Sequence, residues 1–388
     1  MFTLVMLSGL SVLSLNMFVP SLSNIAHTFQ ADYALVNLSI AGYLTATAFL
    51  QMIIGPLSDR FGRRPVIIGA LVIFIAASIG CFYAQTIWSF LSFRLLQGAI
   101  IAGIALAPAI VRDMLPPQEA ASKIGYVTMA MALAPMLGPM LGGALDELFG
   151  WHASFIFYIG VGLGVLALTW IDLGETHSSK SENFLQQFKS YPELLTSRRF
   201  WGYALCMAFS VGAFYSFLAG APLVAENLFG ISTGELGIYI GSISGGFMFG
   251  NFLSGRYAKR TALTTLIIAG RLSACGGLIL AMVLYMFGVV HVYALFGPIL
   301  FVGIGNGLTL PGCNAGALSV RPKLAGSASG LMGALTVGGG GIVTSFTGSI
   351  LTPQNGVAVL LGVMLACSAF GLAAALYVRH INRLEGIK

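Results

Sequence analysis

Charged residues are the scarcest feature of this sequence. Asp, Glu, Lys and Arg make up 8% of its 388 residues, whereas 57% of the residues are hydrophobic and the mean hydropathy is +0.89. A soluble globular chain carries roughly 25% charged residues. A water-soluble fold of this length could not cover so apolar a core with so few charges. The composition therefore predicts a polytopic membrane protein.

Residue patterns that mark enzyme sites are also missing. The five cysteines lie singly inside apolar runs, which argues against a disulfide or metal framework. HExxH, a cluster of His and Asp ligands and a nucleophile elbow are all absent. The stretch VGGGGIV at 337–343 lacks the Lys-Ser/Thr of a phosphate loop, so it favours close helix packing and not a nucleotide-driven pump. We expect no enzyme activity, no metal and no cofactor.

Long apolar runs dominate the chain instead. A helix needs ~20 apolar residues to cross the hydrocarbon core of a bilayer. Runs between charged residues and Pro or Gly breaks predict twelve transmembrane helices, at 2–24, 33–56, 65–84, 87–112, 123–146, 152–173, 200–225, 234–255, 262–287, 291–317, 326–350 and 356–379. The predicted fold is an all-α polytopic membrane protein whose main partner is the lipid bilayer.

One long polar segment divides these spans six and six. It predicts an N-terminal six-helix half at 1–174, a cytoplasmic central loop at 175–199 and a C-terminal six-helix half at 200–388. The two halves carry similar stretches at corresponding positions. GPLSDRFGRRP (55–65) follows the second span and GNFLSGRYAKR (250–260) follows the eighth, and each has a glycine at the helix end followed by a basic turn. Repeated six-span halves are a common transporter plan, so the halves are expected to be pseudo-symmetric.

The positions of the basic residues predict the orientation. With both termini in the cytoplasm, every Lys and Arg falls at a cytoplasmic loop or helix end except Arg94 and Arg271, which lie within spans. This asymmetry follows the positive-inside rule and predicts a multi-pass protein of the cytoplasmic (inner) membrane. It also accounts for the net charge of +6 without a nucleic-acid partner.

The strongest motif is GPLSDRFGRRP, between the second and third spans. Gly62 permits a tight turn, and Asp59 can bond to the nearby arginines or sit at a helix N-terminus. The stretch resembles the signature loop of the major facilitator superfamily, G-x-L-x-D-R-x-G-R-R/K. The resemblance implies a cytoplasmic gating loop that holds two halves together, and its candidate residues are Gly55, Asp59, Arg60, Gly62, Arg63 and Arg64.

Two further stretches extend this resemblance. FRLLQGAIIAG (93–103) matches the fourth-span pattern R-x-x-Q-G of the superfamily through Arg94, Gln97 and Gly98. An arginine inside a span is costly, so it is a functional candidate by default, with snorkelling to the nearer surface as the alternative. APMLGPMLGGAL (134–145) matches the fifth-span pattern that is characteristic of antiporters, with an alanine in place of its first glycine. Its packing candidates are Gly138, Pro139, Gly142 and Gly143.

Together with NMFVPSLSNIA (16–26), AIVRDML (109–115) and the stretch 314–335, these motifs resemble the twelve-span drug:proton antiporters of the Bcr/CflA type. That branch is associated with bicyclomycin and chloramphenicol resistance. The resemblance implies multidrug efflux by proton antiport, with small molecules and protons as partners, and a monomer.

One position departs from this family. Related antiporters commonly carry an acid in the first span, in a phrase like D-M-Y-L-P, where this chain has Asn16 followed by Met-Phe-Val-Pro. An amide cannot carry a proton. The alternatives for proton binding are then Asp32, Asp113 and Glu226, although a plain position at the mouth of the cavity is the simpler interpretation of Asp32 and Glu226. Otherwise the substrate carries the titratable group, or the protein is a facilitator without obligatory coupling.

The superfamily resemblance also implies that spans one, four, seven and ten line a central cavity. The candidate lining residues are Asn16, Tyr43, Phe209, Phe214, Tyr215 and Asn306. Aromatic rings with a few amides suit a mainly apolar substrate. An ordinary lipid-facing or packing role is the simpler interpretation of each aromatic. For Asn16, a hydrogen bond between helices and a contact with substrate are equally open.

The sequence thus predicts an alternating-access secondary transporter that exports small amphipathic compounds, most simply by proton antiport. The competing hypothesis is a facilitator or importer of a small metabolite on the same fold, since fold does not fix function.

Overall fold

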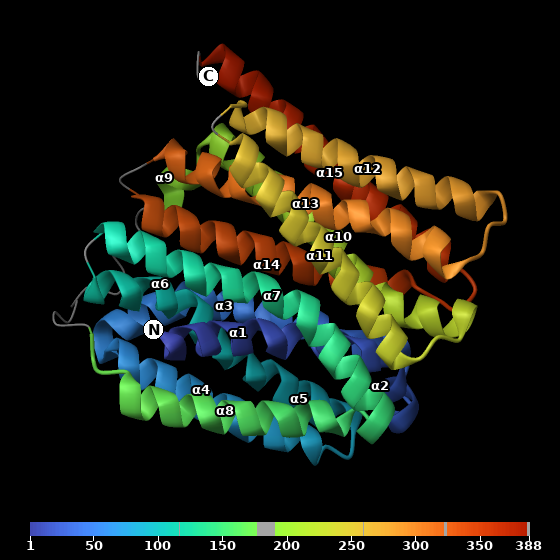
Figure 1. Cartoon of the computed structure of the whole chain (residues 1–388), viewed down its shortest axis with the longest axis horizontal. Helices are drawn as coiled ribbons and strands as arrows, with labels where there is room; N and C mark the ends of the chain where they lie inside the picture. Colours follow the sequence, from blue (N-terminus) through green and yellow to red (C-terminus); the bar gives the residue numbers. More distant parts are fainter. Residues whose placement is uncertain (116, 177–190, 259, 322–323, 386–388) are drawn as a thin grey trace. The chain divides into compact units, whose positions relative to one another are not determined.

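The chain is almost entirely helical in the computed structural model, which describes residues 1–115, 117–176, 191–258, 260–321 and 324–385. Figure 1 shows the order of the helices along the chain. The chain divides into two compact units. One is formed by Met1–Gln186 with Ser232–Ile238, and the other by Gln187–Ile231 with Tyr239–Lys388. The first is called the N-unit and the second the C-unit.

The helices of the two units match the expected spans closely. The N-unit contains α1 (Phe2–Asn16), η1 (Val19–Ser21), α2 (Leu22–Phe29), α3 (Tyr33–Phe61), α4 (Arg63–Phe82), α5 (Ile87–Gln97), η2 (Gly98–Ile101), α6 (Ala102–Met114), α7 (Pro117–Phe149) and α8 (His152–Asp172). The C-unit contains α9 (Tyr191–Leu195), α10 (Arg198–Val224), the π-helix η4 (Ala225–Phe229), most of α11 (Thr233–Tyr257), α12 (Leu263–Met286), α13 (Val292–Val320), α14 (Ala325–Ile350) and α15 (Gly356–Leu384).

These helices confirm the predicted fold class. Eleven helical stretches within the described residues are long and apolar enough to cross a membrane. The helix α7 occupies the place of the fifth expected span, which completes the twelve. The predicted ends differ in places, because the first span continues to Phe29 and the second to Phe61.

Two spans of the N-unit are not continuous α-helices. Span one consists of α1, η1 and α2, and its α-helix stops at Asn16, just before Pro20. Proline lacks a backbone donor and disfavours an α-helical residue before it. Span four consists of α5, η2 and α6 and is interrupted directly after Gln97. Discontinuous helices of this kind often surround transporter binding sites, because the interruption frees polar backbone groups.

Serines of α1 bind the interrupted backbone of span four. Ser11 donates to the carbonyl of Ile100 at 2.7 Å, and Ser8 donates to that of Gly103 at 3.4 Å. A Cβ at Gly103 would lie 2.6 Å from the Ser11 hydroxyl, so only glycine permits this close approach. The two discontinuous spans are therefore fastened to each other through backbone groups.

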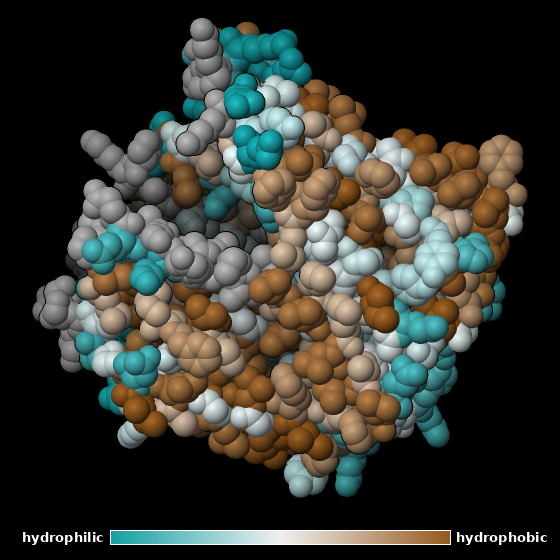
Figure 2. Space-filling view, in the orientation of Figure 1, coloured by the Kyte–Doolittle hydropathy of each residue, from teal (hydrophilic) through white to brown (hydrophobic). Residues whose placement is uncertain are grey.

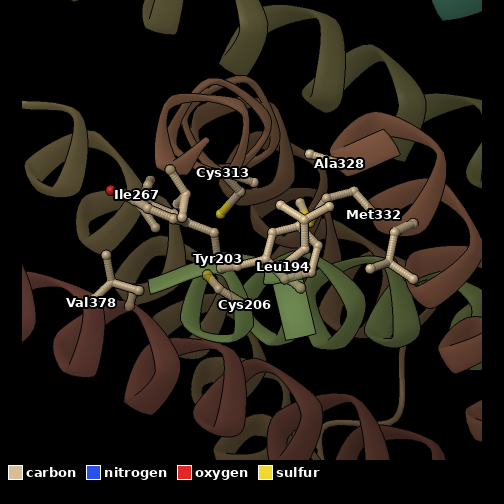
Figure 3. Packing of buried hydrophobic residues seen from close by; sticks show 14 of the residues in the cluster. Leu194, Tyr203, Cys206, Ile267, Cys313, Ala328, Met332 and Val378 are labelled. Carbon is tan, nitrogen blue, oxygen red and sulfur yellow. The ribbon is translucent and has the colours of Figure 1, made fainter. Parts of the chain in front are cut away.

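A hydrophobic core fills the C-unit. Figure 3 shows buried residues of α9, α10, α12, α13, α14 and α15 packed together. Tyr203 lies in this cluster, and its hydroxyl accepts a hydrogen bond from Asn382 at 3.2 Å. Its ring packs directly over Gly316 of α13, where a Cβ would collide with ring atoms. The absence of a side chain at Gly316 therefore lets α10 and α13 approach closely.

Large apolar side chains also cover the outer surface, as expected for a protein in lipid. On α8, for example, Ile156, Leu163, Trp170 and Ile171 are exposed. In Figure 2 the lower edge of the view, where α4 and α8 lie, is coloured mostly as hydrophobic. In water this surface would aggregate, and it accounts for much of the apolar composition.

The contact between Gly316 and Tyr203 provides a test of the C-unit core. We expect Gly316→Ala to lower stability by about 1–3 kcal/mol, because overpacking forces neighbours to shift. The check is the melting temperature of the purified protein in detergent. Gly297→Ala is the matched control, since it lies on the same helix with no atom within 4 Å of the added Cβ. Equal melting temperatures for both variants would contradict this packing.

Candidate functional site

The cytoplasmic motif forms a turn of a single residue. The helix α3 runs to Phe61 and α4 starts at Arg63, so only Gly62 leaves helical geometry, with φ of +101°. Side chains rarely adopt that conformation. A Cβ there would also collide with the Glu175 carboxylate. The expected loop is therefore shorter than the motif, and Gly55, Asp59 and Arg60 lie within α3.

Arg63 is the centre of the charge cluster at this turn. Its guanidinium lies 2.6 Å from Asp59 and 3.3 Å from Asp113, and it also donates to the Ser58 hydroxyl. The Glu175 carboxylate accepts from the backbone N–H of Arg63 at 3.0 Å, at the start of α4, where the helix dipole favours an anion. The motif predicts that Asp59 lies near the arginines. It does not indicate Glu175, which lies outside the motif and beyond the sixth span.

The other two arginines of the motif make different contacts. Arg64 donates from Nη2 to the backbone carbonyl of Trp170 at 2.8 Å, and its guanidinium lies over the Trp170 ring. Arg60 is exposed and lies 5.4 Å from the centre of the Phe61 ring. Arg63 therefore holds α3, α6 and the segment after α8 together, whereas Arg60 and Arg64 face the outside of the cluster.

Asn16 occupies the end of α1, directly at the break in span one. It is buried, and its Nδ2 donates to the carbonyl of Val12 at 2.9 Å within the same helix. Its Oδ1 is also buried and has no hydrogen-bond donor among the described residues. A buried acceptor without a donor costs roughly 1–3 kcal/mol, which makes this oxygen a natural point of contact for a ligand or a water molecule.

Arg94 lies beneath the same break and is completely buried. Its guanidinium carbon lies 4.1 Å from the centre of the Phe18 ring and 4.7 Å from that of Tyr43. Nη1 donates to the backbone carbonyl of Ser14 at 3.3 Å and to the side chain of Gln97. None of the described residues forms an ion pair with it, and its Nε and Nη2 lack hydrogen-bond acceptors.

The end of α1 supplies the polarity that offsets this charge. The last carbonyls of a helix lack intrahelical donors and carry the negative end of its dipole. Tyr158 donates toward the carbonyls of Leu13 and Ser14, at 3.2 and 3.3 Å, so the same carbonyl group binds both side chains. Tyr43 donates to the Ser14 hydroxyl at 3.1 Å. Arg94 is thus held in place and does not snorkel to the surface.

The rest of the fourth-span motif completes this network. The Gln97 amide donates to the Ser78 hydroxyl of α4 at 2.7 Å. Gly98 begins η2, and a Cβ there would lie 3.3 Å from Thr47 of α3. The structure therefore places Arg94, Gln97 and Gly98 together at the interruption of span four. It also assigns Tyr43 to this network and not to an open wall.

The antiporter glycines pack against the break in span one. A Cβ at Gly138 would lie 3.2 Å from Leu13 and 3.7 Å from the Cβ of Asn16, and one at Gly142 would collide with the Met17 carbonyl. These two residues therefore form the smooth face that the pattern indicates. Pro139 lies inside the continuous helix α7, and Gly143 faces the Thr233 carbonyl of the segment 232–238.

The C-unit has a buried arginine of its own. Arg271 of α12 is completely buried and donates from Nη2 to the Asn306 side-chain oxygen at 2.6 Å and from Nε to Thr309 at 3.0 Å. Its Nη1 has no acceptor among the described residues. This bond uses one of the two acceptor positions of the Asn306 oxygen and leaves the N–H groups of that amide unengaged by Arg271.

The predicted aromatic residues of span seven are partly buried and contact other rings. The rings of Phe209 and Phe370 lie 5.4 Å apart, and those of Phe214 and Tyr215 lie 5.9 Å apart. Tyr215 also packs over Gly340 of α14. Packing within the C-unit therefore accounts for part of the surface of each ring.

The three acids proposed for proton coupling differ in their surroundings. Asp32 precedes α3 and is exposed, and Glu226 is exposed in the π-helix η4. Asp113 binds Arg63 in the cytoplasmic cluster. Asp146 near the end of α7 is only 6% exposed and accepts a hydrogen bond from Asn24 of α2 at 2.8 Å. The sequence placed Asp146 among ordinary span ends and did not indicate its burial.

The family follows from a match along most of the chain. Residues 4–345 match the profile described as Major Facilitator Superfamily. The chain belongs to the major facilitator superfamily. It is accordingly a multi-pass membrane transporter of small molecules and not an enzyme.

Curated relatives match nearly the full length. A bicyclomycin resistance protein homolog from Haemophilus influenzae is 26% identical, over 98% of this chain and 96% of the relative. A chloramphenicol resistance protein from Pseudomonas aeruginosa is also 26% identical, with coverage of 97% and 89%. An uncharacterized MFS-type transporter from Bacillus subtilis is 29% identical, with coverage of 96% and 94%. These names confirm the expected Bcr/CflA-type resemblance.

Solved structures show the same fold at lower identity. A peptide transporter in complex with sulfate is 14% identical, with a TM-score of 0.80 and coverage of 99% of this chain and 95% of that chain. A D-xylose-proton symporter is 18% identical, with a TM-score of 0.75 and coverage of 97% and 96%. These likenesses establish the superfamily fold and carry no information about the substrate.

The Arg94 network yields a direct prediction. We expect Arg94→Lys to lower transport by about tenfold or more. The reason is that an ammonium group cannot reproduce a planar guanidinium that lies between two aromatic rings and donates to both Ser14 and Gln97. Its melting temperature should also fall, since buried partners lose their donor. Transport into vesicles and thermal melting provide the measurements. Arg383→Lys, at an exposed arginine of α15 outside the motifs, is the control. Full activity of the Arg94→Lys protein would mean that only the charge matters.

Proposed function

We propose that this transporter exports small amphipathic, drug-like compounds by proton antiport. The observation that carries the proposal is the likeness, over almost the whole chain, to relatives named for bicyclomycin, chloramphenicol and multidrug resistance. The packing of Gly138 and Gly142 against span one supports it, since these glycines belong to the antiporter pattern.

In this proposal the substrate binds at a site near the middle of the membrane. In the N-unit the proposed substrate contact is the free Oδ1 of Asn16. In the C-unit the proposed contacts are the N–H groups of Asn306 and the partly exposed rings of Phe209, Phe214 and Tyr215. None of these groups is a carboxylate, so an uncharged or weakly polar compound is favoured over a strictly cationic one. Apolar walls with a few polar contacts are typical of such sites.

The transport cycle is proposed to alternate access by rocking the halves 1–174 and 200–388, joined by the segment 175–199. The Arg63 cluster then serves as the cytoplasmic gate of this cycle. The distribution of basic residues supports an inner-membrane location with both termini in the cytoplasm. The functional unit in this proposal is a monomer.

The experiment that tests this function uses the purified protein in sealed vesicles. A pH gradient is imposed, and the movement of chloramphenicol is followed together with the internal pH. The proposal predicts uptake of the drug against its gradient, accompanied by proton movement in the opposite direction. Drug movement that ignores the gradient and moves no protons would instead identify a facilitator. A panel of other uncharged amphipathic compounds extends the assay, and transport of none of them would contradict the proposal.

The role of Asn16 can be tested separately. We expect Asn16→Ala to raise the KM for substrate about 3- to 10-fold, the loss of one neutral hydrogen bond, with little change in melting temperature. The reason is that, within the described part of the chain, the amide of Asn16 makes one hydrogen bond, to Val12 in its own helix.

Asn227→Ala is the matched control, because Asn227 makes the same bond to the residue four positions earlier, Leu223, at 2.8 Å, but is exposed. An Asn16→Ala protein with an unchanged KM and a lower melting temperature would make Asn16 a packing residue.

A further inference from the structure

Proton antiport requires a group that can be sheltered from water and can gain and lose a proton as the protein changes state. In this chain Asn16 cannot serve, because an amide does not titrate. Asp32 and Glu226 are exposed, and Asp113 is held by Arg63. The acids singled out from the sequence therefore leave the proton without a sheltered binding group.

Asp146 has the required surroundings. It is the only Asp or Glu among the residues with described side chains that is buried, at 6% exposure. Asn24 donates to its Oδ2 at 2.8 Å, and none of the described lysines and arginines forms an ion pair with it. Burial without a cation favours the neutral form of a carboxyl group, so such a group can exchange a proton.

The position of Asp146 on α7 connects it with span one. Gly138, Gly142 and Asp146 are spaced four residues apart, which places them on one face of the helix. The first two contact the end of α1 and Met17, and the third contacts Asn24 on α2. The antiporter glycines and Asp146 therefore face the same discontinuous span. A shift of α7 along span one would change the environment of this carboxylate.

The titratable groups around Asp146 are few. His152 of α8 interacts with it electrostatically, and its ring stacks on Trp151 at 3.6 Å between ring centres. His27 lies one turn beyond Asn24 on α2 and is exposed. Next to Asp146, Glu147 binds the Ser232 hydroxyl at 3.0 Å and the Gly234 N–H at 3.1 Å. Glu235, in the same segment, is exposed.

Three groups near Asp146 cannot titrate in the relevant range: Asn24, Ser21 and Thr233. Asn24 is exposed, so it connects the buried carboxylate with the surface at this end of α7. Under the proposed topology this is the outer end of the helix. A proton from the outer side therefore has a short polar route to Asp146.

We infer that Asp146 is the carboxylate that carries the coupled proton, which rests on the proposed antiport function. The proton comes from water on the outer side and protonates Asp146, which removes its charge and weakens its bond to Asn24. Span one and α7 are then free to move against each other. In the opposite state the carboxyl group releases the proton toward the cytoplasmic side, and binding of substrate favours this release.

Asp146→Asn tests the inference. The variant keeps the shape of the side chain but cannot titrate. We expect it to lose drug accumulation driven by a pH gradient and to retain exchange of labelled for unlabelled drug without a gradient. Asp146→Glu should restore accumulation with a shifted pH profile, which a purely structural role would not produce.

Glu147→Gln is the matched control, because this neighbouring acid is exposed, and it should keep both activities. His152→Gln tests whether the other titratable group beside Asp146 carries the proton, and this variant should keep proton coupling. A proton-driven wild type whose Asp146→Asn variant still accumulates drug with an unchanged pH profile would overturn the inference alone. Loss of coupling in His152→Gln but not in Asp146→Asn would assign the proton to the histidine. A wild type that does not respond to the gradient would overturn the proposed function, and the inference with it.

Should Asp146→Asn fail to fold, Asp146→Glu still decides the matter. A pH profile of accumulation identical to that of the wild type would then overturn the inference, and a displaced profile would support it.

Discussion

The buried charge of Arg94 at the broken end of span one is the interaction on which the rest of the N-unit depends. No described carboxylate offsets it; the carbonyl end of α1 and two aromatic rings do so instead. This arrangement requires that α1 stop at Asn16, because an uninterrupted helix would have no free carbonyls to offer. The end of α1, the buried Arg94 and the amide of Asn16 therefore depend on one another.

The close packing of α7 follows from the same break. Gly138 and Gly142 let α7 reach the end of α1, and this contact brings Asp146 beside Asn24. The first span contains no acid in this chain, yet a buried carboxylate faces that span from a neighbouring helix.

Much of this architecture is predictable from the sequence, because it depends on local patterns. The apolar runs predict the spans, and the basic residues predict their orientation. The motif predicts that Asp59 lies close to arginines, and the structure identifies Arg63 as its partner. The burial of Asp146 is different, since it depends on Asn24, 122 residues away in the chain. The same holds for Glu175 at the start of α4, 112 residues from Arg63. One local signal was present: Asp146 continues the four-residue spacing of Gly138 and Gly142, so it shares their face of α7.

Proton coupling without a first-span acid is the central claim, and the number of protons released when substrate binds tests it most directly. Calorimetric titration of the purified wild-type protein, in buffers that differ in ionisation enthalpy, measures this number independently of any membrane gradient. The account predicts a net release that approaches one proton per bound substrate in the pH range where the buried carboxyl group is protonated before binding. Saturable binding with no proton release at any pH of the titration would contradict it.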